Sequence, residues 1–228
     1  MGDQGADQKA IAEEFTFKQY DKYADSKYVK HVLILSSQWT AASFGTYLLL
    51  YLNKYLAGTI YLNYYFDGIA GVVAYIIGKP LYQYCKIKNS FITSNAITIF
   101  GAIFILLFDG GYLSPYFIDS LGCPPSGYPE GSEKDKKYHL NKIIPWFTFT
   151  AKVGTHLTFS NAFQASFSDQ RVFPLLKRAT ATGICNFVGR GLTIFAPLVA
   201  ELDKPLPMIF LLVVTFIAFV ASFFLPSR

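Results

Sequence analysis

The amino-acid sequence predicts an all-α, polytopic membrane protein with six transmembrane helices. Apolar residues make up 52% of the 228 residues and charged residues only 15%, whereas about a quarter of a typical soluble domain is charged. Six runs of roughly twenty residues are almost entirely apolar, the length that crosses about 30 Å of hydrocarbon as a helix. No run alternates apolar and polar residues throughout, so strands and a membrane barrel are not expected.

The six predicted helices follow one another as a single bundle from residue 31 to residue 225. Their ranges are 31–52, 58–78, 91–108, 143–167, 181–200 and 206–225. Ionisable residues interrupt three of them: Asp67 the second, Lys152 and His156 the fourth, and Arg190 the fifth.

Two polar segments flank these helices. The N-terminal tail, 1–30, is polar with near-balanced charge, and aromatic residues in its part 15–29 fit a solvated tail, an interfacial helix or an arm that binds a partner. A long loop, 109–142, is rich in glycine, proline and charge.

The distribution of Lys and Arg predicts that both ends of the bundle lie on the inner side. Twelve of these residues fall in the two ends and in the loops 79–89 and 168–180, against six in the opposite loops. No Asn-x-Ser/Thr glycosylation acceptor occurs in the chain. An organellar membrane fits this composition, and the mitochondrial inner membrane is the expected location.

Several other functional classes are not expected. The net charge is +5, but the Lys and Arg residues are spread between apolar runs and form no nucleic-acid face. Cys85, Cys123 and Cys185 are scattered, without the spacing of a metal site or a natural bridge. Nucleophile-elbow, phosphate-loop and His-Glu-x-x-His motifs are missing. We therefore expect no enzymatic activity, cofactor or metal.

The segment from Pro174 to Pro197, PLLKRATATGICNFVGRGLTIFAP, joins a short basic loop to a helix with three glycines. Small residues on a helix let a neighbour approach closely. The segment resembles the second half of major facilitator superfamily transporters of the organic-ion branch. IYLNYYFDGIAG, at 60–71, looks like the eighth helix of that family. The resemblance covers about 30–226 and implies that the six helices correspond to family helices seven to twelve.

The resemblance also locates an inner gate. The residues at the positions of the gate motif are Gly78, Lys86, Pro174, Arg178 and Gly183. Tyr82 and Arg171 stand where the family carries acidic residues, whose charge-assisted contacts would hold one state of the gate. We therefore expect that this chain lacks the contacts that would hold the inner gate in one state. Facilitators rock two such bundles around a central site, so a single bundle is expected to need a partner.

Lys152, His156, Arg190 and Asp67 are the candidate site residues, and two interpretations are open. Arg190 and Lys152 match positions where organic-anion carriers of the family are basic, so with His156, one turn after Lys152, they would bind an organic anion. Alternatively, Lys152 or Arg190 pairs with Asp67 inside the bundle and His156 is a packing residue.

The expected function is an accessory structural subunit of a larger membrane protein complex, derived from a transporter half. The alternative is a half-transporter that pairs with another six-helix half to carry an organic anion. The expected partners are the lipid bilayer and other membrane protein subunits, or a second six-helix half, and not nucleic acid.

Overall fold

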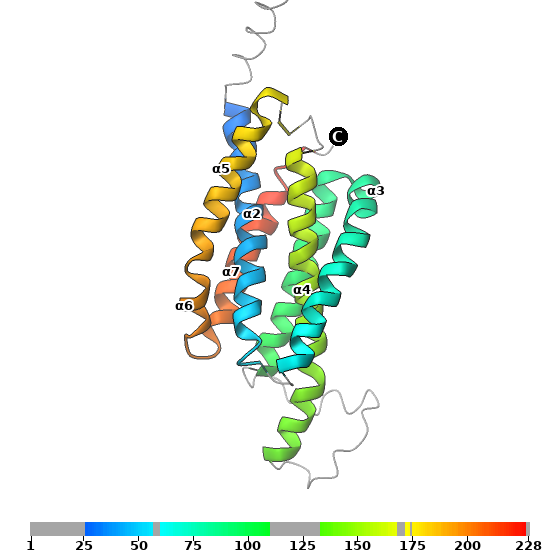
Figure 1. Cartoon of the computed structure of the whole chain (residues 1–228), viewed down its shortest axis with the longest axis vertical. Coiled ribbons are helices and arrows are strands. Elements are labelled where there is room, and N and C mark those ends of the chain that lie inside the picture. The colour runs from blue at the N-terminus through cyan, green and yellow to red at the C-terminus, as the bar shows by residue number, and fades with distance from the viewer. Residues whose placement is uncertain (1–25, 57–59, 110–132, 168–171, 174, 227–228) are drawn as a thin grey trace, which may run out of the picture.

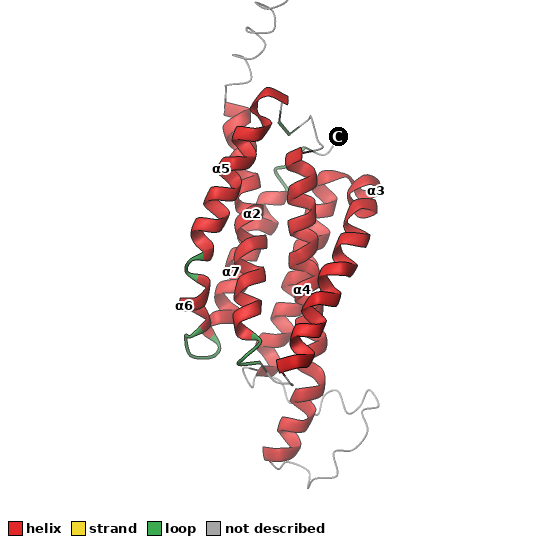
Figure 2. Ribbon diagram, viewed as in Figure 1, coloured by secondary structure: helices red, strands yellow, loops and turns green. Residues whose placement is uncertain are grey.

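The computed structural model describes residues 26–56, 60–109, 133–167, 172–173 and 175–226. These residues are helical apart from short connections, so the predicted all-α class is confirmed (Figure 2). The elements are α2 (Ser26–Leu52), α3 (Ile60–Asp109), α4 (Glu133–Phe167), α5 (Leu175–Thr193), α6 (Ala196–Ala200) and α7 (Leu206–Ser222). Most of the predicted tail and of the loop 109–142 lies outside the described residues, as do Cys123, Arg171 and Pro174.

The longest element, α3, consists of two helical arms. At Lys86 the backbone leaves the helical region, with φ 62° and ψ 165°. Figure 1 shows α3 turning back on itself, so that the arms 60–85 and 87–109 run antiparallel. The expected loop at 79–89 is therefore helical on both sides of Lys86. Gly78 lies where α4 comes close, since a Cβ there would be 2.7 Å from Ser160 Oγ.

Other predicted boundaries shift as well. α2 begins at Ser26 and α4 at Glu133, before the apolar runs that predicted them. These first turns are polar, so an apolar run does not reveal them. The fifth predicted helix is divided into α5 and α6 at 194–195. Pro197 explains this break, because proline has no N–H that could donate to the carbonyl of Thr193, four residues earlier.

Helix α2 lies between α5 and α4, with α7 behind it (Figure 1). Trp39 fixes this position: its indole Nε1 donates to Ser166 Oγ of α4 at 3.3 Å, and its ring meets Phe159 and Phe163 edge-on. On the other side, a Cβ at Gly189 of α5 would lie 3.1 Å from the Trp39 carbonyl oxygen. Glycine at 189 therefore lets α5 approach the α2 backbone.

The second arm of α3 packs against α4 with backbones in contact. A Cβ built on Gly101 would lie 2.5 Å from the backbone nitrogen of Ala151, and one on Gly154 would lie 2.5 Å from that of Thr98. This is closer than side-chain packing allows, so the approach depends on both glycines. Contacts of this kind favour helix pairs that associate through van der Waals packing.

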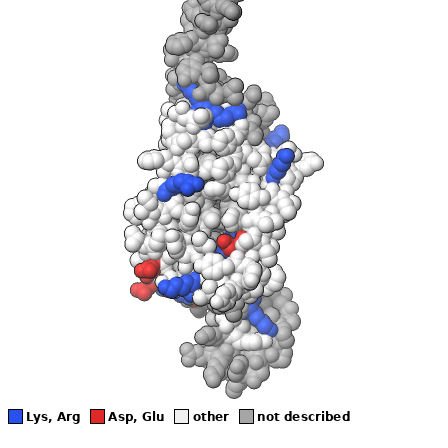
Figure 3. Space-filling view, in the orientation of Figure 1, with Lys and Arg blue, Asp and Glu red and all other residues white. Residues whose placement is uncertain are grey.

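Apolar side chains form the core of the bundle and also cover its outside, and a number of polar side chains are buried between the helices. Large exposed apolar residues occur on every long helix and include Leu33, Tyr61, Phe100, Trp146, Phe187 and Phe216. Buried polar residues include Gln38, Asn95, Thr98, Lys152, Asn161 and Ser222. Figure 3 shows a face with few charged side chains. Within the described residues, two helical stretches, Ile60–Asp109 and Lys177–Ala200, are long and apolar enough to cross a membrane.

Candidate functional site

Lys152 of α4 is buried, with only 1% of its side chain exposed, and its ammonium group is surrounded by oxygen atoms. Nζ donates to Asn53 Oδ1 at 2.8 Å and to the backbone carbonyl of Asn63 at 3.2 Å. It also lies 3.3 Å from Asp67 Oδ1. An ammonium has three N–H donors, and three acceptors are within reach. The internal contacts therefore satisfy Lys152 fully.

Asp67 of the first arm of α3 faces a second basic side chain. His156 Nε2 lies 3.7 Å from Asp67 Oδ1. Gly71, one turn after Asp67, lies next to this ring, since a Cβ there would be in ordinary contact with it at 3.9 Å. Asp67 is 21% exposed and His156 is 18% exposed, so this edge reaches the surface. We call Asn53, Asn63, Asp67, Lys152 and His156 the Asp67 cluster.

The positive charge of Lys152 and the negative charge of Asp67 compensate each other in this cluster. A buried ammonium without a counter-ion is strongly unfavourable, and so is a carboxylate that has lost its cation. Asn53 follows α2, Asn63 and Asp67 belong to the first arm of α3, and Lys152 belongs to α4. The cluster therefore ties three helices together.

Arg190, the fourth candidate residue, is separate from this cluster. Its side chain is exposed on α5, and its Nε donates to Asn186 Oδ1 at 2.9 Å, one turn earlier in the same helix. It makes no hydrogen bond or ion pair with the described residues of the Asp67 cluster. The structure thus brings Lys152, His156 and Asp67 together and leaves Arg190 apart. An isolated arginine at the centre of a membrane helix costs about 2.5–3.5 kcal/mol on insertion scales.

The inner-gate positions also lie apart from one another. Gly78 packs on Ser160, and Lys86 forms the reversal of α3. Arg178 Nη1 donates to the backbone carbonyl of Phe167 and so links the end of α4 to the start of α5. Gly183 has open space around its Cα, and Pro174 lies outside the described residues. Gly78, Lys86 and Arg178 thus serve helix packing or helix ends, whereas Gly183 faces open space.

A second polar network joins four helices and was not among the candidates from sequence. Gln38 Nε2 of α2 donates to the Ala218 carbonyl of α7 at 2.6 Å and to Ser222 Oγ at 3.0 Å. Asn95 Nδ2 of α3 donates to Gln38 Oε1 at 2.9 Å, and Thr158 Oγ1 of α4 donates to Asn95 Oδ1 at 3.3 Å. Gln38 and Asn95 are each the only amide residue of a predicted helix, 31–52 and 91–108, and that was the sequence signal that could have revealed this network.

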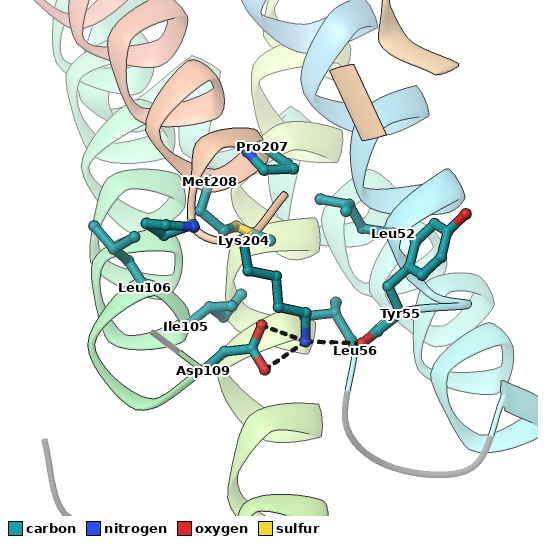
Figure 4. A pocket seen from close by; sticks show the side chains of 10 residues that line it. Leu52, Tyr55, Leu56, Ile105, Leu106, Asp109, Lys204, Pro207 and Met208 are labelled. Atoms are coloured by element: carbon teal, nitrogen blue, oxygen red, sulfur yellow. Dashed lines mark hydrogen bonds and ion pairs between the residues drawn. The ribbon is translucent and has the colours of Figure 1, made fainter. Parts of the chain in front are cut away.

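A third set of contacts fastens one end of the bundle (Figure 4). Lys204 Nζ lies 2.8 Å from Asp109 Oδ2 and donates to the Tyr55 carbonyl at 3.1 Å. These residues follow α2, end α3 and precede α7. Apolar side chains, among them Leu56 and Met208, line a cavity of about 20 Å³ beside them. That is room for about one water molecule, so this end is a closure and not a ligand pocket.

The described residues offer no metal site. They contain no group of three His, Cys, Asp or Glu side chains that could hold an ion. Cys85 and Cys185 are free thiols. Cys185 is buried, where its sulfur accepts a hydrogen bond from Ser36 at 3.4 Å.

Comparisons with known proteins found no matching family model, no matching curated protein and no matching solved structure.

Proposed function

We propose that this chain is an integral membrane protein that serves as a structural subunit, packing against other membrane proteins. The six spans of the proposal are α2, the two arms of α3, α4, α5 with α6, and α7. The shortest, α7, has 17 residues and is about 26 Å long, close to the thickness of a bilayer core. The proposal assigns the chain no catalytic step.

The placement of polar and apolar side chains supports membrane embedding. A soluble protein of this size would not leave large apolar residues exposed along every long helix while burying amides and a lysine. In hydrocarbon the same arrangement is favourable, because polar groups between helices bond one another and apolar groups face lipid. Gln38, Asn95 and Lys152 fit this pattern, since each is buried and bonded across helices.

The main observation that favours a structural role is that all three N–H donors of the Lys152 ammonium have acceptors inside the protein. An anion-binding lysine needs a donor that is free for the substrate, but the three donors of Lys152 have internal acceptors. Binding an anion there would require opening contacts between α2, α3 and α4. The family origin that the sequence resemblance implies, and the mitochondrial inner membrane as its location, are parts of the proposal.

Two measurements test the structural role. Full-length protein solubilised mildly from its membrane should migrate on a native gel with an assembly larger than itself. The same chain, purified and reconstituted in vesicles, should not accumulate a labelled aromatic carboxylate such as benzoate above the level of empty vesicles. Uptake by the chain alone that is lost in Lys152→Met and kept in Lys54→Met would overturn the proposal.

Arg190 favours a second candidate, a half-transporter that pairs with another six-helix half to carry an organic anion. Its guanidinium is exposed within a long apolar stretch and uses one donor in its own helix. Uptake that appears only when the chain is reconstituted with its partner protein, and that is lost in Arg190→Gln, would favour this candidate. Unchanged uptake in Arg190→Gln would exclude Arg190 as its substrate contact.

A further inference from the structure

One face of α5 is uncovered along most of its length. Gly183, Phe187, Arg190 and Gly191 recur at helical spacing and share this face, and Ile194, in the break directly after α5, continues it. Phe187 is 81% exposed and Ile194 is 71% exposed, and nothing lies within 4 Å of a Cβ built on Gly183 or Gly191. We call these five residues the Arg190 face. The opposite side of α5, with Ala181, Cys185 and Gly189, is buried.

Arg190 is the only charged residue of this face, and most of its hydrogen-bonding capacity is unused. A guanidinium carries five N–H donors, and one of them, on Nε, reaches Asn186. The two terminal amino groups have no partner among the described residues. Their planar fork matches the two oxygens of a carboxylate.

The position of Arg190 in the apolar stretch prevents it from reaching a membrane surface. The stretch Lys177–Ala200 has 24 residues, and Arg190 lies thirteen residues after its start. At 1.5 Å per residue this is about 20 Å from one end and about 15 Å from the other. An arginine side chain is much shorter than either distance. Its charge must therefore be compensated at the depth where it lies.

We propose that the Arg190 face docks a membrane-spanning helix of a partner protein, and that this helix carries an Asp or Glu opposite Arg190. The inference rests on the membrane embedding of the proposed function. Charge complementarity selects the carboxylate. The open space beside Gly183 and Gly191 admits a closely approaching helix, with Phe187 and Ile194 packing at its sides. The face is apolar except for Arg190, so the helix should be apolar except for its acid.

A reconstituted system tests this docking without knowledge of the natural partner. The full chain, labelled with a donor fluorophore, is placed in lipid vesicles with one of two synthetic Leu-Ala transmembrane helices labelled with an acceptor. The helices are identical except for a central Asp in one and a central Asn in the other. Energy transfer should show at least about tenfold stronger association with the Asp helix. That preference should disappear in Arg190→Gln.

Two matched variants show whether the charge pair causes the association. The Arg190→Glu variant should no longer associate with the Asp helix. It should associate instead with a third synthetic helix that has a Lys at its centre. Asn186→Ala removes the intrahelical acceptor but keeps the guanidinium, so it should retain the preference for the Asp helix.

Specific outcomes overturn the inference. One is equal association with the Asp and Asn helices by a chain that is inserted in the vesicles, and another is an Asp preference that survives in Arg190→Gln. Displacement of the Asp helix by millimolar benzoate would instead assign Arg190 to a soluble organic anion. A chain that does not enter the vesicles at all would contradict the proposed function itself, so the two failures are distinguishable.

Discussion

Two cationic residues of the predicted membrane segments have opposite surroundings. Lys152 is buried against Asn53, Asn63 and Asp67, whereas Arg190 is exposed and, among the residues that the structure describes, bonded only to Asn186. Both residue types cost free energy in hydrocarbon when they are isolated. The first is compensated within the chain, and we infer that the second is compensated by another molecule.

Breaking the Lys152–Asp67 pair should destabilise the bundle. Lys152→Met leaves the Asp67 carboxylate without its nearest cation, and Asp67→Asn leaves a buried ammonium uncompensated. Each should lower the free energy of unfolding by about 3 kcal/mol, the lower end of the range for a buried pair, because Asp67 is 21% exposed. Unfolding in mixed detergent micelles titrated with SDS would measure this.

A double variant and a surface variant serve as controls. Lys152→Met combined with Asp67→Leu removes both charges and should cost less than the sum of the single changes. Lys54→Met, whose side chain is exposed beside Tyr55, should change stability by less than about 0.5 kcal/mol. Single changes at 152 and 67 that are as neutral as Lys54→Met would show that the pair does not stabilise the fold.

Lys86 holds a backbone conformation that suits glycine. Its φ of 62° and ψ of 165° lie in a region that side chains disfavour by about 1–3 kcal/mol. Lys86→Gly should therefore raise the free energy of unfolding by about 1 kcal/mol. Lys88→Gly, two residues on and inside the second arm, should lower it by about 1 kcal/mol. Thermal unfolding in detergent compares them, and a loss of stability in Lys86→Gly would contradict the reversal at this residue.

At the scale of elements, helix pairs are held by small residues and by polar bonds between them. The second arm of α3 and α4 touch at Gly101 and Gly154, and α5 meets α2 at Gly189. Gln38, Asn95 and Ser222 then connect α2, α3 and α7. In the membrane setting that we propose, no large hydrophobic force acts between helices, so such packing and bonding would set which helices are neighbours.

Filling the closest contact should separate α3 from α4. Gly101→Ala places a Cβ 2.5 Å from the Ala151 nitrogen, and backbone atoms cannot move aside as a flexible side chain can. We expect a loss of about 1–3 kcal/mol in the free energy of unfolding, as for other overpacked sites. Gly183→Ala, with open space around it, is the matched control and should be neutral or stabilising through helix propensity. Equal stability of the two variants would disprove the backbone contact.

At the scale of the whole molecule, the bundle has an apolar core that contains buried polar networks, and its outer surface is also largely apolar. The exposed apolar surface occurs on all the long helices, and Lys204, paired with Asp109, fastens one end. Lys86 and Asp203 are both exposed, and they belong to different turns of the proposed topology. In a six-span arrangement the turn at Lys86 is on the inner side and the turn at Asp203 on the outer side.

Cysteine labelling tests this arrangement. In a chain whose native cysteines are replaced, single cysteines at Lys86→Cys and Asp203→Cys should react with a membrane-impermeant maleimide from opposite sides of sealed vesicles. Each should become fully reactive after detergent is added. Equal labelling of both in intact vesicles, with the chain released by alkaline carbonate, would show that the bundle does not span the bilayer.

The sequence predicted the helical class, because the length and apolar content of a run depend on local residues alone. It did not predict the polar starts of α2 and α4, which precede the apolar runs. It expected a loop at 79–89, and the chain does reverse there, at Lys86, but the residues on both sides of Lys86 are helical.

For the candidate site, too, the sequence determined one part and the tertiary structure the other. The sequence by itself determined which ionisable residues interrupt apolar runs, since that is a matter of composition. Only the tertiary structure decided their partners. Asp67 and Lys152 are separated by 85 positions, and the packing of α3 on α4 brings their charges to 3.3 Å while α5 carries Arg190 apart from them. Electrostatic energy depends on distance in space, and that distance is set only when the helices pack.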